Sequence, residues 1–154
     1  GRLPGKKILL KGNHDYWWRR EATNRIQRSL PSDITLLVGH CITVESCSIA
    51  GTRGWRLEEG TDADEKVLKR ELLYLERALK EMPEGYRRIA LLHYPPFDQD
   101  LTFNSFDELA RRYNVDEIIY GHIHGGETIE GQINGVTYRC ISADQIGFKP
   151  VLII

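Results

Sequence analysis

The stretch Gly12-Asn13-His14-Asp15 decides how the rest of this sequence is interpreted. It follows a short apolar run, Ile8-Leu9-Leu10, which is typical of a buried β-strand. An amide and an imidazole side by side at the end of such a strand pack poorly, because buried polar groups need hydrogen-bond partners. The pattern is explained if both side chains point into a polar site.

Two later stretches repeat this arrangement. Leu91-Leu92-His93 and Tyr120-Gly121-His122-Ile123-His124 are apolar runs that end in imidazole. Ligands of open α/β sheets bind beyond the carboxyl ends of the strands, so we expect the three strand ends to converge. Glycine at positions 12 and 121 lets the backbone turn sharply and approach a ligand. The His-x-His spacing is common among metal ligands.

Composition places the chain among ordinary globular proteins. Its 154 residues, 41% hydrophobic and 28% charged, predict a single domain over residues 1–154. The net charge of -1 gives no indication of nucleic acid or an anionic membrane as a partner. The three sparse cysteines, without C-x-x-C spacing, predict reduced thiols and a cytoplasmic location. The chain lacks Met at position 1 and reaches a strand at once, so we expect a fragment cut on its N-terminal side.

Strand and helix patterns alternate first, and strands alone follow. Helices are predicted over residues 16–30, 62–82 and 105–113, with N-terminal caps at Asp15, at Thr61 with Asp64, and at Ser105 with Glu108. Strands are predicted over residues 7–11, 34–38, 41–44, 48–52, 88–93, 115–120, 127–130, 132–141 and 150–154. The Val38-Gly39-His40 turn predicts a hairpin between residues 34–38 and 41–44. This order favours a layered α/β sandwich.

The three histidine stretches resemble the calcineurin-like metallophosphoesterases, a superfamily with five motif blocks. The last three blocks, G-N-H-[DE], a strand ending in His, and G-H-x-H, are present in order as Gly12-Asn13-His14-Asp15, His93 and Gly121-His122-Ile123-His124. With Gly51-Thr52-Arg53-Gly54-Trp55 and His93-Tyr94-Pro95-Pro96-Phe97, the chain is similar to a bacterial branch of predicted phosphohydrolases. The resemblance implies a four-layer αββα sandwich, here truncated at its N-terminus.

The resemblance also implies a role for each matched residue. Asn13, His93 and His122 would bind one metal ion, and His124 would bind the second. His14 would be the catalytic residue that protonates the leaving oxygen or stabilises the phosphoryl group. The implied reaction is phosphoester hydrolysis with two divalent ions, Mn²⁺, Fe²⁺/Fe³⁺ or Zn²⁺.

The first two blocks, D-x-H and G-D-x-x-D, are absent before Gly12. In the family they supply the carboxylates, including the one that bridges both metals. The matched ligands are therefore neutral, and two dications held close by neutral ligands repel strongly. We expect this chain alone to bind metal weakly and to be inactive, with the missing N-terminal segment of the same domain restoring both properties.

Two alternatives remain open at this stage. One is a mononuclear zinc hydrolase site built from His93, His122 and His124. The other is a non-catalytic interaction module on the same fold. Polar side chains kept at strand ends argue against the second alternative.

The remaining expectations concern residues outside the three histidine motifs. Arg53 is the best candidate for substrate binding, because glycines flank its loop, whereas His40 is expected to be a turn residue. The three tryptophans are expected mainly as packing residues, and Glu58-Glu59 as a solvated face. Acidic residues at 62–65 are expected to complement a helix dipole rather than bind metal.

Overall fold

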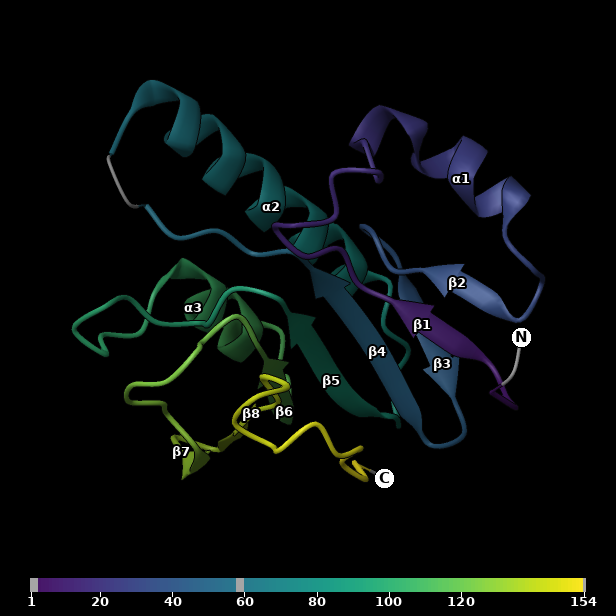
Figure 1. Ribbon diagram of the computed structural model, residues 1–154. Helices are drawn as coiled ribbons and strands as arrows, with labels where there is room; N and C mark the ends of the chain where they lie inside the picture. The colour runs from purple at the N-terminus through teal and green to yellow at the C-terminus, as the bar shows by residue number, and fades with distance from the viewer. Residues whose placement is uncertain (1–2, 58–59, 154) are drawn as a thin grey trace.

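The fold is built on one six-stranded sheet and one two-stranded sheet (Figure 1). The computed structural model describes residues 3–57 and 60–153, so Glu58-Glu59 and Ile154 lie outside the described residues. The large sheet has the order β3-β4-β5-β6-β8-β7, with β4, β5, β6 and β8 parallel and an antiparallel strand at each edge. Its strands are β3 (Cys41–Val44), β4 (Cys47–Thr52), β5 (Arg87–Leu92), β6 (Glu117–Tyr120), β7 (Gly131–Ile133) and β8 (Val136–Cys140). In the small sheet β1 (Lys7–Leu9) pairs in parallel with β2 (Ile34–Leu36).

Two helices cover one face of the large sheet. They are α2 (Asp62–Lys80) and α3 (Ser105–Arg112), and their apolar faces meet the strands in the main core. This core includes Leu75 and Leu79 of α2, Phe106 of α3, and Ile118 and Tyr120 of β6. The N-terminal cap of α2 is confirmed, because the Thr61 hydroxyl accepts a 3.2 Å hydrogen bond from the Asp64 N–H.

The small sheet packs on the opposite face of the large one. Neighbouring strand residues face opposite sides, and Ala50 belongs to the helix-side core, so Gly51 faces the small sheet. A Cβ at Gly51 would lie 2.7 Å from the Leu37 side chain and 3.1 Å from the Leu10 side chain. The same Cβ would lie 2.7 Å from the Leu91 carbonyl oxygen of the neighbouring strand, so glycine leaves room both for the leucines of the small sheet and for the β5 backbone. The 3₁₀ turn Arg20–Ala22 and α1 (Thr23–Ser29) connect β1 to β2, and α1 packs beside β2.

The prediction of a helix from residue 16 is wrong for its first turns, which are irregular up to Arg20. Asp15 does not cap that helix. Its carboxylate instead accepts hydrogen bonds from the Gly12 N–H (2.7 Å) and the Trp17 indole N–H (2.9 Å). Because the Asp15 carboxylate is engaged in these loop hydrogen bonds, it does not cap the N-terminus of a helix. Trp17 is exposed, whereas Trp18 is buried and packs as expected.

The predicted hairpin between residues 34–38 and 41–44 is also wrong. β2 pairs with β1, so the Val38-Gly39-His40 turn carries the chain from the small sheet to the large one. The hairpin joins β3 to β4 through Glu45-Ser46, with Glu45 at a φ of 51°. His40 is a turn residue as expected, and its Nδ1 lies 3.0 Å from the Val38 carbonyl oxygen.

Three further differences concern element ends. The cap of α3 is Asn104, whose side chain accepts a 3.0 Å bond from the Phe106 N–H, rather than Ser105. The single strand expected over residues 132–141 is the β7–β8 hairpin, and residues 127–130 and 150–153 form no strand. The fold is thus mixed α/β, with three α-helices in the described part of the chain. None of its described helices combines the length and apolar character needed to cross a lipid bilayer.

Candidate metal centre

Three side chains from separate strand ends meet at the carboxyl edge of the sheets. Asn13 follows β1, His93 follows β5, and His122 follows β6. The His93 Nε2 lies 2.9 Å from the Asn13 Oδ1 and 3.2 Å from the His122 Nδ1. These contacts join residues 80 and 29 positions apart, so the tertiary fold creates the cluster. We refer to Asn13, His93 and His122 as the histidine cluster.

The backbone at two positions is shaped by this arrangement. A Cβ at Gly12 would lie 3.3 Å from both Cε1 and Nδ1 of the His93 ring, so glycine leaves room for the imidazole. His122 has a φ of 72°, in the left-handed region that costs a non-glycine residue roughly 1 kcal/mol. Such strain gathers at functional sites, where the surrounding structure maintains it.

His93 is the member of the cluster whose pKa is strongly lowered. Burial, the neighbouring His122 and the charge of Arg53 lower the pKa of His93 from 6.5 to about 4, and Asp15 opposes this shift. At neutral pH the His93 imidazole is therefore uncharged. The neutral ring is the form that binds metal ions.

Tyr94 forms an aromatic wall beside the cluster, which the sequence analysis did not assign to the site. Its ring centroid lies 4.2 Å from that of His122 and 5.2 Å from that of His93. Its other neighbour is Trp55, at 5.4 Å. Tyr94 is buried, so it limits the access of water to the two imidazoles. In the sequence, the feature that could have indicated this role of Tyr94 is its position directly after His93.

His14 and His124 lie outside this convergence. His14 is exposed, and its Nδ1 lies 3.3 Å from the Tyr16 hydroxyl. His124 is exposed as well, with its ring centroid 6.4 Å from that of His122 and its Nδ1 3.3 Å from the Asp144 Oδ2. Among residues 3–57 and 60–153, no group of three or more His, Cys, Asp or Glu side chains is arranged to hold a metal ion.

The donor set fits one divalent cation better than two. The amide oxygen of Asn13 and the imidazole nitrogens of His93 and His122 already converge, and such mixed N/O donors suit Mn²⁺, Fe²⁺ and Zn²⁺. For a second cation the described residues provide His124, with Asp144 beside it. That pair alone does not complete a coordination shell.

Arg53 lies next to the cluster but has other partners. Its guanidinium stacks over the Trp55 ring at 4.5 Å and lies 3.8 Å from the Glu71 carboxylate. Burial is the main cause that lowers the pKa of Arg53, and the charge of Glu71 opposes it. Arg53 is therefore a fixed cation near His93 rather than a free surface arginine.

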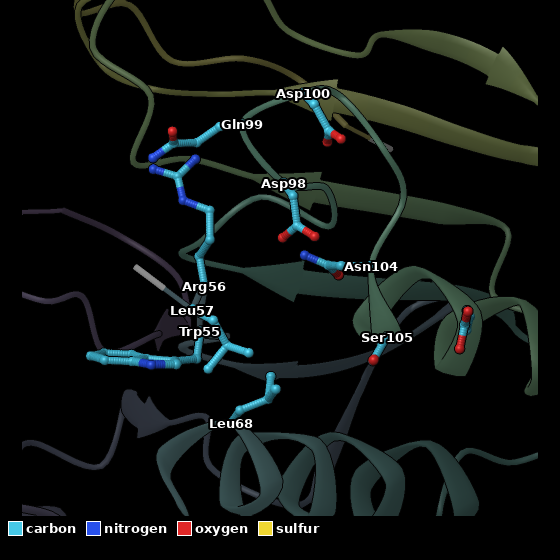
Figure 2. Close-up of a pocket in the computed structure, with 10 residues that line it drawn as sticks. Trp55, Arg56, Leu57, Leu68, Asp98, Gln99, Asp100, Asn104 and Ser105 are labelled. Atoms are coloured by element: carbon cyan, nitrogen blue, oxygen red, sulfur yellow. The ribbon is translucent and has the colours of Figure 1, made fainter. Parts of the chain in front are cut away.

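Two cavities adjoin this region. One of about 440 Å³ runs below the histidines between β1 and the large sheet, lined largely by Ile8, Leu10, Leu91, Ile119 and Ile141, with His93, His122 and His124 at its polar end. The other, about 520 Å³, lies beyond Trp55 (Figure 2) and is lined by Trp55, Arg56, Leu57, Leu68, Asp98, Gln99, Asp100, Asn104, Ser105 and Glu108. Figure 2 shows the Trp55 indole pointing away from Asp98 and Ser105. Trp55, which lines the larger cavity, is linked to the histidine cluster through the Tyr94 ring.

The calcineurin-like phosphoesterase family matches residues 2–126 of the sequence. The chain belongs to this family. The matched range includes the histidine cluster, His14 and His124. Among curated proteins, the chain is 27% identical over 147 residues to a probable cyclic nucleotide phosphodiesterase of Rhodopseudomonas palustris. That match covers 89% of this chain and 52% of the relative, so the chain spans about half the relative's length. No solved structure shows a significant match.

Proposed function

We propose that this phosphoesterase is a metal-dependent phosphoester hydrolase of the two-metal type. Asn13, His93 and His122 would hold one divalent cation, and His124 would hold the second. The observation that carries the proposal is the meeting of an amide oxygen and two imidazoles within hydrogen-bonding distance at the carboxyl edge of the sheets. An amide oxygen and two imidazole nitrogens brought together from three strand ends form a donor set that suits a divalent cation.

In this proposal each residue of the site has a distinct task. Bound divalent cations supply charge that lowers the pKa of water and neutralises phosphoryl oxygens. His14, exposed beside the cluster, delivers a proton to the leaving oxygen, and the Tyr16 hydroxyl near its Nδ1 limits the orientations of the ring. Arg53, held by Glu71 and Trp55, adds positive charge that attracts the phosphoryl group. Tyr94 shields the cluster from bulk water.

We further propose that carboxylate ligands come from an N-terminal segment of the same domain. The neutral histidine cluster cannot by itself offset the repulsion of two dications. The apolar cavity between β1 and the large sheet would receive such a segment and complete the four-layer αββα sandwich. The chain's match to about half of its relative is compatible with a longer domain.

The name of the relative suggests a cyclic nucleotide phosphodiester as one substrate to test. Phosphate monoesters and diesters of other alcohols fit the same chemistry, so a substrate panel is required. The free cysteines, two of them buried, support our proposal of a cytoplasmic location.

The decisive experiment compares this chain with one extended at its N-terminus to include the carboxylate segment. We expect the extended protein to bind two Mn²⁺ or Zn²⁺ ions and to hydrolyse p-nitrophenyl phosphate, its bis ester or a cyclic nucleotide. We expect this chain alone to bind metal weakly and to show no turnover. His93→Gln in the extended protein should reduce the rate at least ~100-fold, whereas the remote Glu84→Gln should not. Full activity from this chain alone would contradict the carboxylate proposal.

A further inference from the structure

Asp144 lies on a turn that the structure fixes in place beside His124. The segment after β8 begins with a hydrogen bond of 2.8 Å from the Ile141 N–H to the Tyr120 carbonyl. Within the turn, the Ile146 N–H donates to the Ser142 carbonyl at 3.1 Å. Ser142 itself is buried. The carboxylate of Asp144 is therefore presented from an ordered backbone.

Two contacts tie this turn to the Gly121-His122-Ile123-His124 segment. The Gln145 side-chain amide donates to the Ile123 carbonyl at 3.4 Å, and the Asp144 Oδ2 lies 3.3 Å from the His124 Nδ1. Because these contacts flank the same short segment, the turn constrains both its backbone and its last imidazole. With Nδ1 only 3.3 Å from the carboxylate, Nε2 is the nitrogen that remains for a metal ion.

We propose that Asp144 is a positioning residue that orients His124 so that its Nε2 binds a divalent cation. This inference rests on the proposed metal-dependent function. Histidines that bind metals usually direct their second ring nitrogen to a carboxylate or carbonyl, which fixes the ring and strengthens the ligand. Asp144 also places one negative charge beside a set of otherwise neutral donors. Its role is indirect, through the His124 imidazole.

The test is a metal titration of the full chain and of its variants, with Zn²⁺ followed by calorimetry. Asp144→Asn keeps the size of the side chain and removes the charge, and we expect it to weaken Zn²⁺ binding about tenfold, as loss of an outer partner typically does. Glu127→Gln is the matched control, because Glu127 is an exposed acid close in sequence to His124. Its variant should bind Zn²⁺ like the parent chain.

A double-mutant cycle separates positioning from other roles. If Asp144 acts through His124, Asp144→Asn should cost nothing further in a His124→Ala background. Equal losses in both backgrounds would mean that Asp144 binds the cation directly or acts through its charge alone, and would overturn the proposal. If His124→Ala leaves affinity unchanged, the metal role of His124 fails, which is a failure of the proposed function.

A second readout needs no metal. Nitrogen-15 NMR of the imidazoles reports which ring nitrogen carries the proton. We expect His124 to hold its proton on Nδ1 in the parent chain and to shift toward Nε2–H in Asp144→Asn. The same tautomer in the parent and Asp144→Asn chains would overturn the positioning role, even if metal affinity were too weak to measure.

Discussion

Two polar clusters, one buried and one half-buried, stand close to each other in this protein and are built in opposite ways. Glu71 of α2 is fully buried, and Arg20 and Thr52 donate hydrogen bonds to its two oxygens. Arg53 and Arg70 add charge at 3.8 and 3.7 Å. The histidine cluster instead joins one amide and two imidazoles, those of Asn13, His93 and His122, through contacts of 2.9 and 3.2 Å.

The difference shows what each cluster requires. A buried charge is tolerated only when partners compensate it, and Glu71 has them within the chain. The histidine cluster brings together an amide oxygen and imidazole nitrogens, which are groups that bind divalent cations, so we expect it to take a cation from outside the chain. One cluster should therefore control the stability of the chain, and the other should control its response to protons and metals.

The largest expected effect comes from breaking the Glu71 cluster. Glu71→Ala leaves buried arginines uncompensated, and we expect the free energy of unfolding to fall by about 3–5 kcal/mol. Urea denaturation of the chain measures this loss. The control is Glu65→Gln, which removes an exposed pair with Lys69 and should cost less than about 0.5 kcal/mol. Equal losses for the two variants would show that the Glu71 network is not special.

The histidine cluster should give stability a specific pH dependence. The pKa of His93 is lowered from 6.5 to about 4, so the unfolded chain binds a proton at pH values where the folded chain does not. The metal-free chain should lose stability as pH falls from about 6.5 to about 4, by at most about 3 kcal/mol, and the loss should then level off for this residue. His93→Gln should remove this part of the pH profile, and an unchanged profile would refute the assignment.

Metal addition tests the same cluster at constant pH. A cation that binds only the folded chain should raise its free energy of unfolding by about 2.7 kcal/mol at a concentration one hundred times Kd. Thermal unfolding with and without Zn²⁺ measures the gain. The gain in stability on adding Zn²⁺ should fall markedly in His93→Gln. It should persist in His40→Gln, because His40 lies in a turn outside the histidine cluster. Equal gains in both variants would place the cation elsewhere.

The smallest effect is expected at the rim of the Glu71 cluster. Arg70 is 44% exposed and lies 3.7 Å from a carboxylate that already has closer partners. Arg70→Ala should therefore change the free energy of unfolding by less than about 1 kcal/mol. A loss as large as that of Glu71→Ala would mean that the buried carboxylate depends on its exposed partner.

Local sequence patterns predicted an element well where the residues that stabilise it lie close together in the sequence. The α2 helix and its Thr61 cap depend on residues within one turn of each other, and both are present. The pairing of strands, in contrast, depends on residues far apart in the sequence. The local turn signal at Val38-Gly39-His40 therefore predicts a hairpin that does not form, because β2 pairs with β1. Asp15 failed as a cap for a different, local reason, because its carboxylate accepts hydrogen bonds from Gly12 and Trp17 within its own loop.

In the candidate site, too, local patterns identified some residues and missed others. The motif residues could be chosen from sequence because each follows an apolar run, and Asn13, His93 and His122 do come together. Glu71 and Asp144 could not be found that way. Glu71 looks like any charged residue of an amphipathic helix, and Asp144 lies in a turn-rich stretch without a motif. Their significance comes from tertiary contacts alone.

The close approach of the two sheets at Gly51 has a consequence for the motion of the protein. Asn13 stands at the end of the small sheet and His93 at the end of the large one, and the two sheets are separate hydrogen-bonded units. A cation bound by both residues would cross-link these units. Separation of the small sheet from the large one would then require release of the ion, so amide hydrogen exchange in β1 should slow when metal is bound, well beyond the ligands themselves.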